Sequence, residues 1–198
     1  MLLGFIEQVF PNSALGWVST IFSSLAILIF VFSSMLPSKN KIIIVQCLGH
    51  ILLGIGEFIS NAFSSIIQEI ISITRNVLVY FNKNTKIVNL LLISLGVLFG
   101  TYCAFFGTNT FTPWKGLDKI HWYSFLPIIA NLEYSIVVMA KNLDVKWLKL
   151  SFAISSFLWA TCFMLQGAGL FISGVLNAIN GTCALISFIR LSILEKRD

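Results

Sequence analysis

Long apolar segments separated by short polar breaks constrain this chain more than any other feature of its sequence. Hydrophobic residues make up 57% of the chain and charged residues only 11%, whereas an average soluble domain has roughly 25% charged residues. So few charges cannot cover the surface of a globular protein of 198 residues. Each segment is long enough for an α-helix that crosses a hydrocarbon core of ~30 Å. The sequence therefore predicts an all-α integral membrane protein.

Seven of these segments are predicted to be transmembrane helices within a single membrane domain, residues 1–198. Turn-forming Pro, Gly, Asn and Ser residues and clusters of Lys mark the breaks between most of them. The expected ranges are Ala14–Leu36, Ile42–Ile59, Asn61–Phe81, Ile87–Phe106, Trp122–Ala140, Val145–Leu165 and Gly167–Arg190.

The positive charges predict how the helices are oriented. Two Lys residues, Lys115 and Lys119, fall on one side of the predicted membrane domain, and Arg75 lies inside the third segment. The other side holds Lys39, Lys41, Lys83, Lys86, Lys141, Lys146, Lys149, Arg190, Lys196 and Arg197. An excess of Lys and Arg in short loops marks the cytoplasmic side. We therefore expect the N-terminus outside and the C-terminus in the cytoplasm, and no binding to nucleic acid despite the net charge of +5.

An internal repeat is visible when the chain is compared with itself. One register brings Trp17 onto Trp122, and after a three-residue insertion it brings Phe63 onto Phe171. This register superimposes three consecutive apolar segments on three others. Such self-similarity is the sequence signature of a duplicated structural unit.

The two repeats are expected at residues 14–81 and 122–190, with residues 87–106 as a connecting helix. Because each repeat has an odd number of helices, one extra helix gives both repeats the same orientation in the membrane. The sequence thus predicts a 3+1+3 arrangement of parallel repeats related by an axis along the membrane normal. In transporters built this way, the substrate path lies between the repeats near the midplane.

Polar residues at membrane depth mark the candidate substrate path, because such residues usually face a bundle interior or a cavity. Matching polar stripes run along the third and seventh segments, where Ser65 aligns with Ser173 and Glu69 with Asn177. The candidate substrate-binding residues are Glu69, Ser72, Asn131, Tyr134, Trp159, Ser173, Asn177 and Asn180. The alternative is that these residues only hold helices together by hydrogen bonds. Trp159 is either a stacking platform for a ring-shaped ligand or a packing residue.

Three titratable residues are candidates for proton coupling: Glu69, His50 and Glu133. His50 has a simpler alternative, a hydrogen-bonded role in the core. Pro127 is a candidate hinge, because it lies one turn before Asn131 and removes a backbone hydrogen bond.

The sequence gives no support for catalysis or for a bound cofactor or metal. It contains no catalytic or phosphate-binding motif, and its four Cys form no CxxC pair. Gly96 and Gly100 form a GxxxG motif, a candidate face for helix packing or for a homo-oligomer.

A family resemblance rests on two neighbouring segments, Leu53-Gly54-Ile55-Gly56 and Ser72-Ile73-Thr74-Arg75-Asn76, the second followed by Val77–Phe81. They are similar to the bacterial YgjV inner-membrane family. The 3+1+3 arrangement also resembles the SWEET sugar transporters and the PnuC-type vitamin transporters.

The SWEET resemblance implies that Glu69 and Asn177 occupy the positions of a pair of substrate-binding asparagines, and Trp159 that of a sixth-helix Trp. The chain departs from that pattern because Glu69 replaces one Asn, Phe22 stands where a first-helix proline is expected, and no Pro-Gln signature occurs. The PnuC resemblance implies a small, polar, ring-bearing vitamin or nucleoside.

These observations together predict a permease or facilitator for a small polar metabolite, located in a bacterial plasma membrane. The expected partners are a small-molecule substrate and the lipid bilayer. The alternative function is a non-transporting membrane sensor or assembly module, and an enzyme is not expected.

The predicted orientation can be tested by labelling single cysteines in a background without native Cys. Cysteines that replace Lys39, Lys83 or Lys146 should be protected from a membrane-impermeant maleimide in intact cells, because the charge bias places them in the cytoplasm. A cysteine that replaces Lys115 should be labelled. Labelling from outside at position 83 or 146 would contradict the predicted topology.

Overall fold

The structure is a computed structural model that describes residues 13–59, 63–106, 122–140, 143–166 and 170–195. All regular secondary structure within these ranges is helical, with no β-strand. The α-helices are α2 (Ala14–Met35), α3 (Lys39–Ile59), α4 (Phe63–Tyr80), α5 (Lys86–Phe106), α6 (Leu126–Met139), α7 (Val145–Gln166) and α8 (Leu170–Leu194), and a 3-10 helix η2 (Trp122–Phe125) precedes α6. The all-α prediction is confirmed.

Six helical segments within the described ranges are long and apolar enough to cross a membrane. They comprise α2, α3, α5, α7, α8, and η2 joined to α6. Large apolar side chains such as Leu28, Phe32 and Leu90 face outward, whereas many Ser, Asn and Gln residues are buried. A multi-pass membrane protein follows from this, because a soluble protein rarely exposes large contiguous apolar surface. The remaining helix, α4, carries Glu69 and Arg75 and is the least apolar of the seven.

The helix ends differ from the predicted ranges by a few residues. Helix α3 starts at Lys39, three residues earlier than predicted, and α8 extends to Leu194 instead of ending at Arg190. Pro127 lies in the first turn of α6, directly after the 3-10 helix. A proline there removes no hydrogen bond inside α6. The expected loss of a backbone hydrogen bond at Pro127 is therefore wrong, and a hinge at this position stays a prediction without that reason. Lys115, Lys119 and Lys141 lie outside the described residues.

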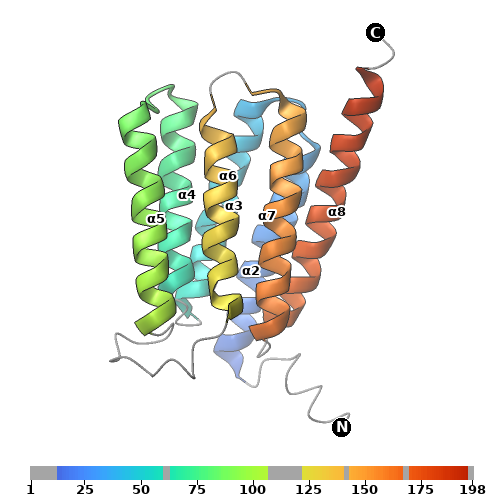
Figure 1. Ribbon diagram of the computed structural model, residues 1–198. Helices are drawn as coiled ribbons and strands as arrows, with labels where there is room; N and C mark the ends of the chain where they lie inside the picture. Colours follow the sequence, from blue (N-terminus) through green and yellow to red (C-terminus); the bar gives the residue numbers. More distant parts are fainter. Residues whose placement is uncertain (1–12, 60–62, 107–121, 141–142, 167–169, 196–198) are drawn as a thin grey trace.

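Six of the helices form a closed ring. Each of α2, α3, α4, α6, α7 and α8 packs against the next in that order, and α8 returns to α2. Helix α5 stands outside the ring against α4 and α6, as Figure 1 shows at one edge of the bundle. Contacts of α2 with α3 and of α3 with α4 therefore have counterparts in those of α6 with α7 and of α7 with α8.

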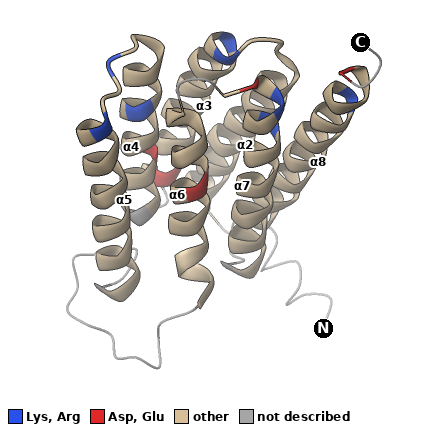
Figure 2. Ribbon diagram, turned by 45° about the horizontal axis from the view of Figure 1, so that its top comes forward, with Lys and Arg blue, Asp and Glu red and all other residues tan. Residues whose placement is uncertain are grey.

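Most of the described Lys and Arg residues gather at one end of the bundle (Figure 2). At this end Lys39 Nζ donates to the backbone oxygen of Ala140 at 2.8 Å. Asn84 Nδ2 donates to the backbone oxygen of Met139 at 3.0 Å. Both bonds join residues from the first part of the chain to the C-terminal end of α6, so they hold this end of the ring closed.

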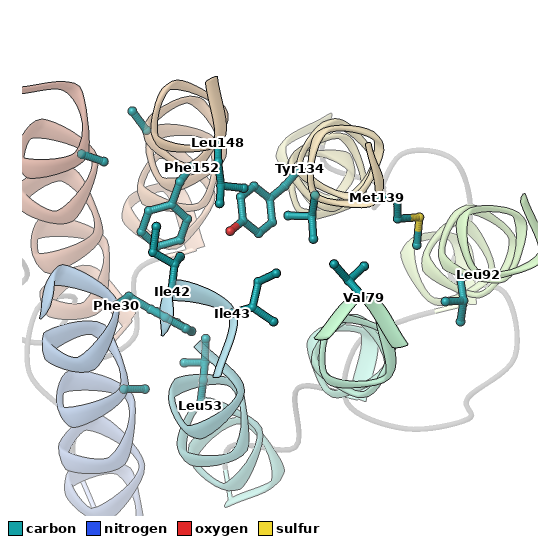
Figure 3. Packing of buried hydrophobic residues seen from close by; sticks show 14 residues of the cluster. Phe30, Ile42, Ile43, Leu53, Val79, Leu92, Tyr134, Met139, Leu148 and Phe152 are labelled. Carbon is teal, nitrogen blue, oxygen red and sulfur yellow. The ribbon is translucent and has the colours of Figure 1, made fainter. Parts of the chain in front are cut away.

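An apolar cluster fills the ring near the same end. Ile42 of α3 lies beside Phe152 of α7, and Ile43 lies on the side of Val79 of α4 (Figure 3). Val138, in the last turn of α6, is fully buried in this cluster. Part of this cluster therefore lies between the middle of the bundle and the basic end, namely Ile42, Ile43, Val138 and Leu148.

The GxxxG motif of α5 is used for packing inside the chain. A Cβ atom on Gly96 would lie 3.6 Å from the nearest side chain, in ordinary contact. A Cβ atom on Gly100 would lie only 2.6 Å from Gln68 Nε2 and 2.8 Å from Ile128 Cγ1. Gly100 thus allows α5 to lie close to α4 and α6, while Gly96 leaves room for a methyl group.

The two glycines give a matched test of this packing. Gly100→Ala should lower the stability by about 1–3 kcal/mol, because the new methyl group overlaps Ile128 and Gln68. Gly96→Ala should be neutral or slightly stabilising, since it lowers the conformational entropy of the unfolded chain. Thermal melting of the purified protein in detergent measures both. Equal melting temperatures for the two variants would contradict the packing role of Gly100.

Candidate substrate cavity

A cavity of about 40 Å³ lies in the interior of the six-helix ring, at the middle of the helices. Its volume corresponds to only a few water-sized groups. All six helices of the ring contribute to its wall. The lining residues are Phe30, His50, Leu53, Glu69, Ser72, Arg75, Asn131, Tyr134, Phe152, Ser155, Ser156, Trp159, Asn177 and Asn180. We refer to this space as the central cavity.

The central cavity brings together all of the predicted substrate-binding residues except Ser173. Ser173 is fully buried next to it, and its backbone oxygen accepts a hydrogen bond of 3.2 Å from Asn177 Nδ2. His50 lines the cavity as well, but Glu133 does not. Glu133 lies on another side of α6, next to Ser151 of α7. Of the three candidates for proton coupling, only His50 and Glu69 therefore share the cavity.

His50 and Glu69 form a close pair between α3 and α4. His50 Nδ1 lies 2.5 Å from Glu69 Oε2, and the side chains are 13% and 4% exposed. The His50 ring also packs edge-on against Phe30, with 4.9 Å between the ring centroids. A carboxylate hydrogen-bonded to an imidazole can share or exchange one proton. This pair therefore places an imidazole and a carboxyl group in contact within the cavity wall.

Arg75 is the centre of a polar network between α4 and α6. Its side chain is 0% exposed. Its Nη1 donates to Asn131 Oδ1 at 2.9 Å and to Ser135 Oγ at 2.8 Å, and its Nε donates to Asn76 Oδ1 at 3.1 Å. The guanidinium carbon lies 4.9 Å from the centroid of the Tyr134 ring, within the range of a cation–π contact. The network holds a cation in the middle of the bundle.

Asn131 extends this network to α5. Its Oδ1 also accepts from Ser72 Oγ at 3.2 Å, and its Nδ2 lies 2.5 Å from Gln68 Oε1. Gln68 Nε2 in turn donates to the backbone oxygen of Gly96 at 3.0 Å. Both groups of the Asn131 amide are thus bonded to protein, which fixes its position in the cavity wall.

The wall formed by α7 and α8 is less tightly bonded. Asn180 Nδ2 donates to Ser156 Oγ at 3.1 Å. Asn180 Oδ1 has no hydrogen-bond partner within the described part of the chain. Trp159 packs against Phe163, with 5.2 Å between the ring centroids. This side of the cavity therefore offers a free amide oxygen and a large aromatic surface.

A second hollow lies between α3 and α4 and also reaches the His50–Glu69 pair. Its volume is about 360 Å³, and its other lining residues are Ile51, Gly54, Ile55, Phe58, Ile66, Ile70 and Ile73. Ile51, Ile55, Phe58 and Ile70 are exposed on the outside of the bundle. The His50–Glu69 pair thus lies between this apolar groove and the central cavity.

Sequence analysis missed several residues of the cavity. Arg75 gave a usable signal, because a cation inside a membrane segment is a candidate functional residue by default. Phe30, Leu53 and Phe152 gave none, since apolar residues of a membrane helix face lipid and interior alike. Ser155 and Ser156 are single small polar residues that occur widely in helix interfaces.

Comparison with known proteins gives no significant match to a family model, a curated protein or a solved structure. The resemblance to the YgjV family and to the SWEET and PnuC transporters therefore stays a prediction.

The hydrogen bond between Tyr134 and Gln46 gives a test of the polar core beside the cavity. Tyr134 Oη donates to Gln46 Oε1 at 2.7 Å, and both side chains are buried. Tyr134→Phe should lower the stability by about 1–3 kcal/mol, because it leaves a buried amide oxygen without its donor. Adding Gln46→Leu should restore part of the loss. Melting temperatures that simply add in the double variant would contradict this pairing.

Proposed function

We propose that this protein is a permease or facilitator for a small polar metabolite, working by alternating access. The moving units would be two three-helix bundles, α2–α4 and α6–α8, with α5 as the connector. The observation that carries the proposal is the central cavity, to which both bundles contribute polar side chains at the middle of the helices. Polar groups at that depth are costly in a membrane protein and usually mark a substrate path.

The order of helix packing supports the 3+1+3 arrangement. In the ring, rotation by half a turn would exchange α2 with α6, α3 with α7 and α4 with α8, and the contact between α4 and α6 would become that between α8 and α2. Glu69 on α4 and Asn177 on α8, which the repeat aligns, both line the cavity. In proteins with parallel repeats, the site lies at such an interface.

The proposed orientation has the basic end in the cytoplasm and the protein in a bacterial plasma membrane. The described Lys and Arg residues near the loops support it, because they gather at one end of the bundle. The cavity is closed toward that end by the apolar cluster and by the bonds of Lys39 and Asn84 to α6. A substrate larger than a few water molecules needs these contacts to open.

The His50–Glu69 pair is proposed to carry the coupling proton. It lies in the cavity wall, so a proton bound there changes the charge that the substrate meets. Two other charged or titratable groups interact electrostatically with Glu69 of this pair: Arg75 on α4 and Glu57 on α3.

The alternative is a membrane sensor or assembly module that transports nothing. The small volume of the cavity, about 40 Å³, favours this alternative. The two functions differ in whether the purified protein moves a solute across a sealed vesicle.

The first step of the test is a thermal-shift screen of the purified protein against sugars, nucleosides and vitamins, since a ligand of the folded state raises its melting temperature. Uptake of the best ligand is then measured in proteoliposomes. Glu69→Gln and Asn177→Ala should each weaken uptake at low substrate concentration by roughly 2- to 100-fold, the equivalent of one hydrogen bond to a ligand.

Ser33→Ala is the control, because Ser33 is equally buried but bonds only to its own helix, at the Phe30 backbone oxygen. Melting temperatures of all three variants separate binding from folding. Normal uptake with lowered melting temperatures in both cavity variants would assign the polar stripe to helix packing and reject the site.

A further inference from the structure

Arg75 is a buried cation whose hydrogen-bond partners are all uncharged. Its hydrogen bonds go to two Asn amides and a Ser hydroxyl. None of the described carboxylates forms an ion pair with it, and Glu69 of the same helix is paired with His50 instead. An Arg guanidinium stays protonated in proteins. Its charge therefore has no ion-pair partner among the described residues of the interior, and Glu69 of the same helix interacts with it only through space.

One nitrogen of Arg75 is left for a ligand. Nη1 and Nε are bonded to protein, whereas Nη2 has no hydrogen-bond partner among the described residues, although the side chain is 0% exposed. Arg75 lines the central cavity. A planar guanidinium matches the geometry of a carboxylate better than that of any neutral solute. Nη2 is thus the position on this cavity-lining guanidinium that the described protein leaves without a hydrogen bond.

We propose that the central cavity binds the carboxylate group of a small organic acid, with Arg75 as its counter-ion. This inference rests on the proposed transport function and names the substrate class for the same cavity. The hydroxyls of Ser155 and Ser156 line the same space and can donate to the second carboxylate oxygen. Phe152 and Trp159 supply apolar surface for the carbon body of the acid. The present volume, about 40 Å³, suits the carboxylate group itself.

The direct test compares acids with their uncharged amides on the native protein. The probes are acetate against acetamide and benzoate against benzamide, titrated at constant ionic strength while the melting temperature is followed. The acids should stabilise the protein with at least a tenfold lower Kd than the amides, because hydrogen bonds to charged groups are about twice as strong as neutral ones. This comparison needs no variant.

Two variants then assign the effect to Arg75. Arg75→Gln removes the charge. Asn76→Asp keeps the size of the side chain and places a carboxylate next to Arg75 Nε. The change breaks no hydrogen bond of the Asn76 amide nitrogen, because Nδ2 has no partner among the described residues. Both should lose the response to acids. Asn82→Asp adds the same charge in the exposed turn after α4 and should keep it.

The outcomes separate this inference from the proposed function. Equal binding of acids and amides, or acid binding that survives Asn76→Asp, would overturn the role of Arg75 while leaving a solute site in place. Absence of binding by all four probes would overturn the carboxylate assignment, whereas the uptake assay with neutral solutes would still decide whether the protein transports. Loss of acid binding in Asn76→Asp but not in Asn82→Asp supports the inference.

Discussion

The burial of Arg75 is the constraint on which the arrangement of the other polar residues depends. A charge in the interior of a membrane bundle must be met by hydrogen bonds at almost every donor, because neither lipid nor bulk water supplies them. Asn131 and Ser135 on α6 meet Nη1, which fixes α6 against α4. Asn131 continues to Gln68, and Gln68 to the backbone of α5 at Gly96. One network thus positions three helices and leaves a cavity beside them.

The approximate position of each helix could be predicted, because each apolar segment is about as long as the helix that it forms. Helix α2 begins at Ala14, where the pattern places it. The bond of Lys39, the first residue of α3, to Ala140 could not be predicted, because the two residues lie 101 positions apart in the chain. The contact of α8 with α2 is equally invisible in the sequence, since closure of the ring depends on the packing of all six helices.

Residues of the candidate site could be predicted from the sequence only where polar residues recur with helical spacing. Glu69 and Ser72 share a face of α4, and Asn177 and Asn180 a face of α8, so helical periodicity alone brings each pair to one surface. The pairing of Glu69 with His50 was not predictable, because it depends on how α3 and α4 are rotated against each other. Sequence spacing within one helix carries no information about that rotation.

The two bonds that close the basic end depend on the side chain of only one of the two residues that each bond joins. Both bonds that cross there, from Lys39 and from Asn84, end on main-chain oxygens at the C-terminus of α6. Every peptide unit carries such an oxygen, whatever its side chain. Selection can therefore tune the closure through residues of the first half of the chain, whereas side-chain replacements at Met139 or Ala140 leave the acceptors intact. Loss of these two bonds by substitution is therefore expected at Lys39 or Asn84 and not at the residues that accept from them.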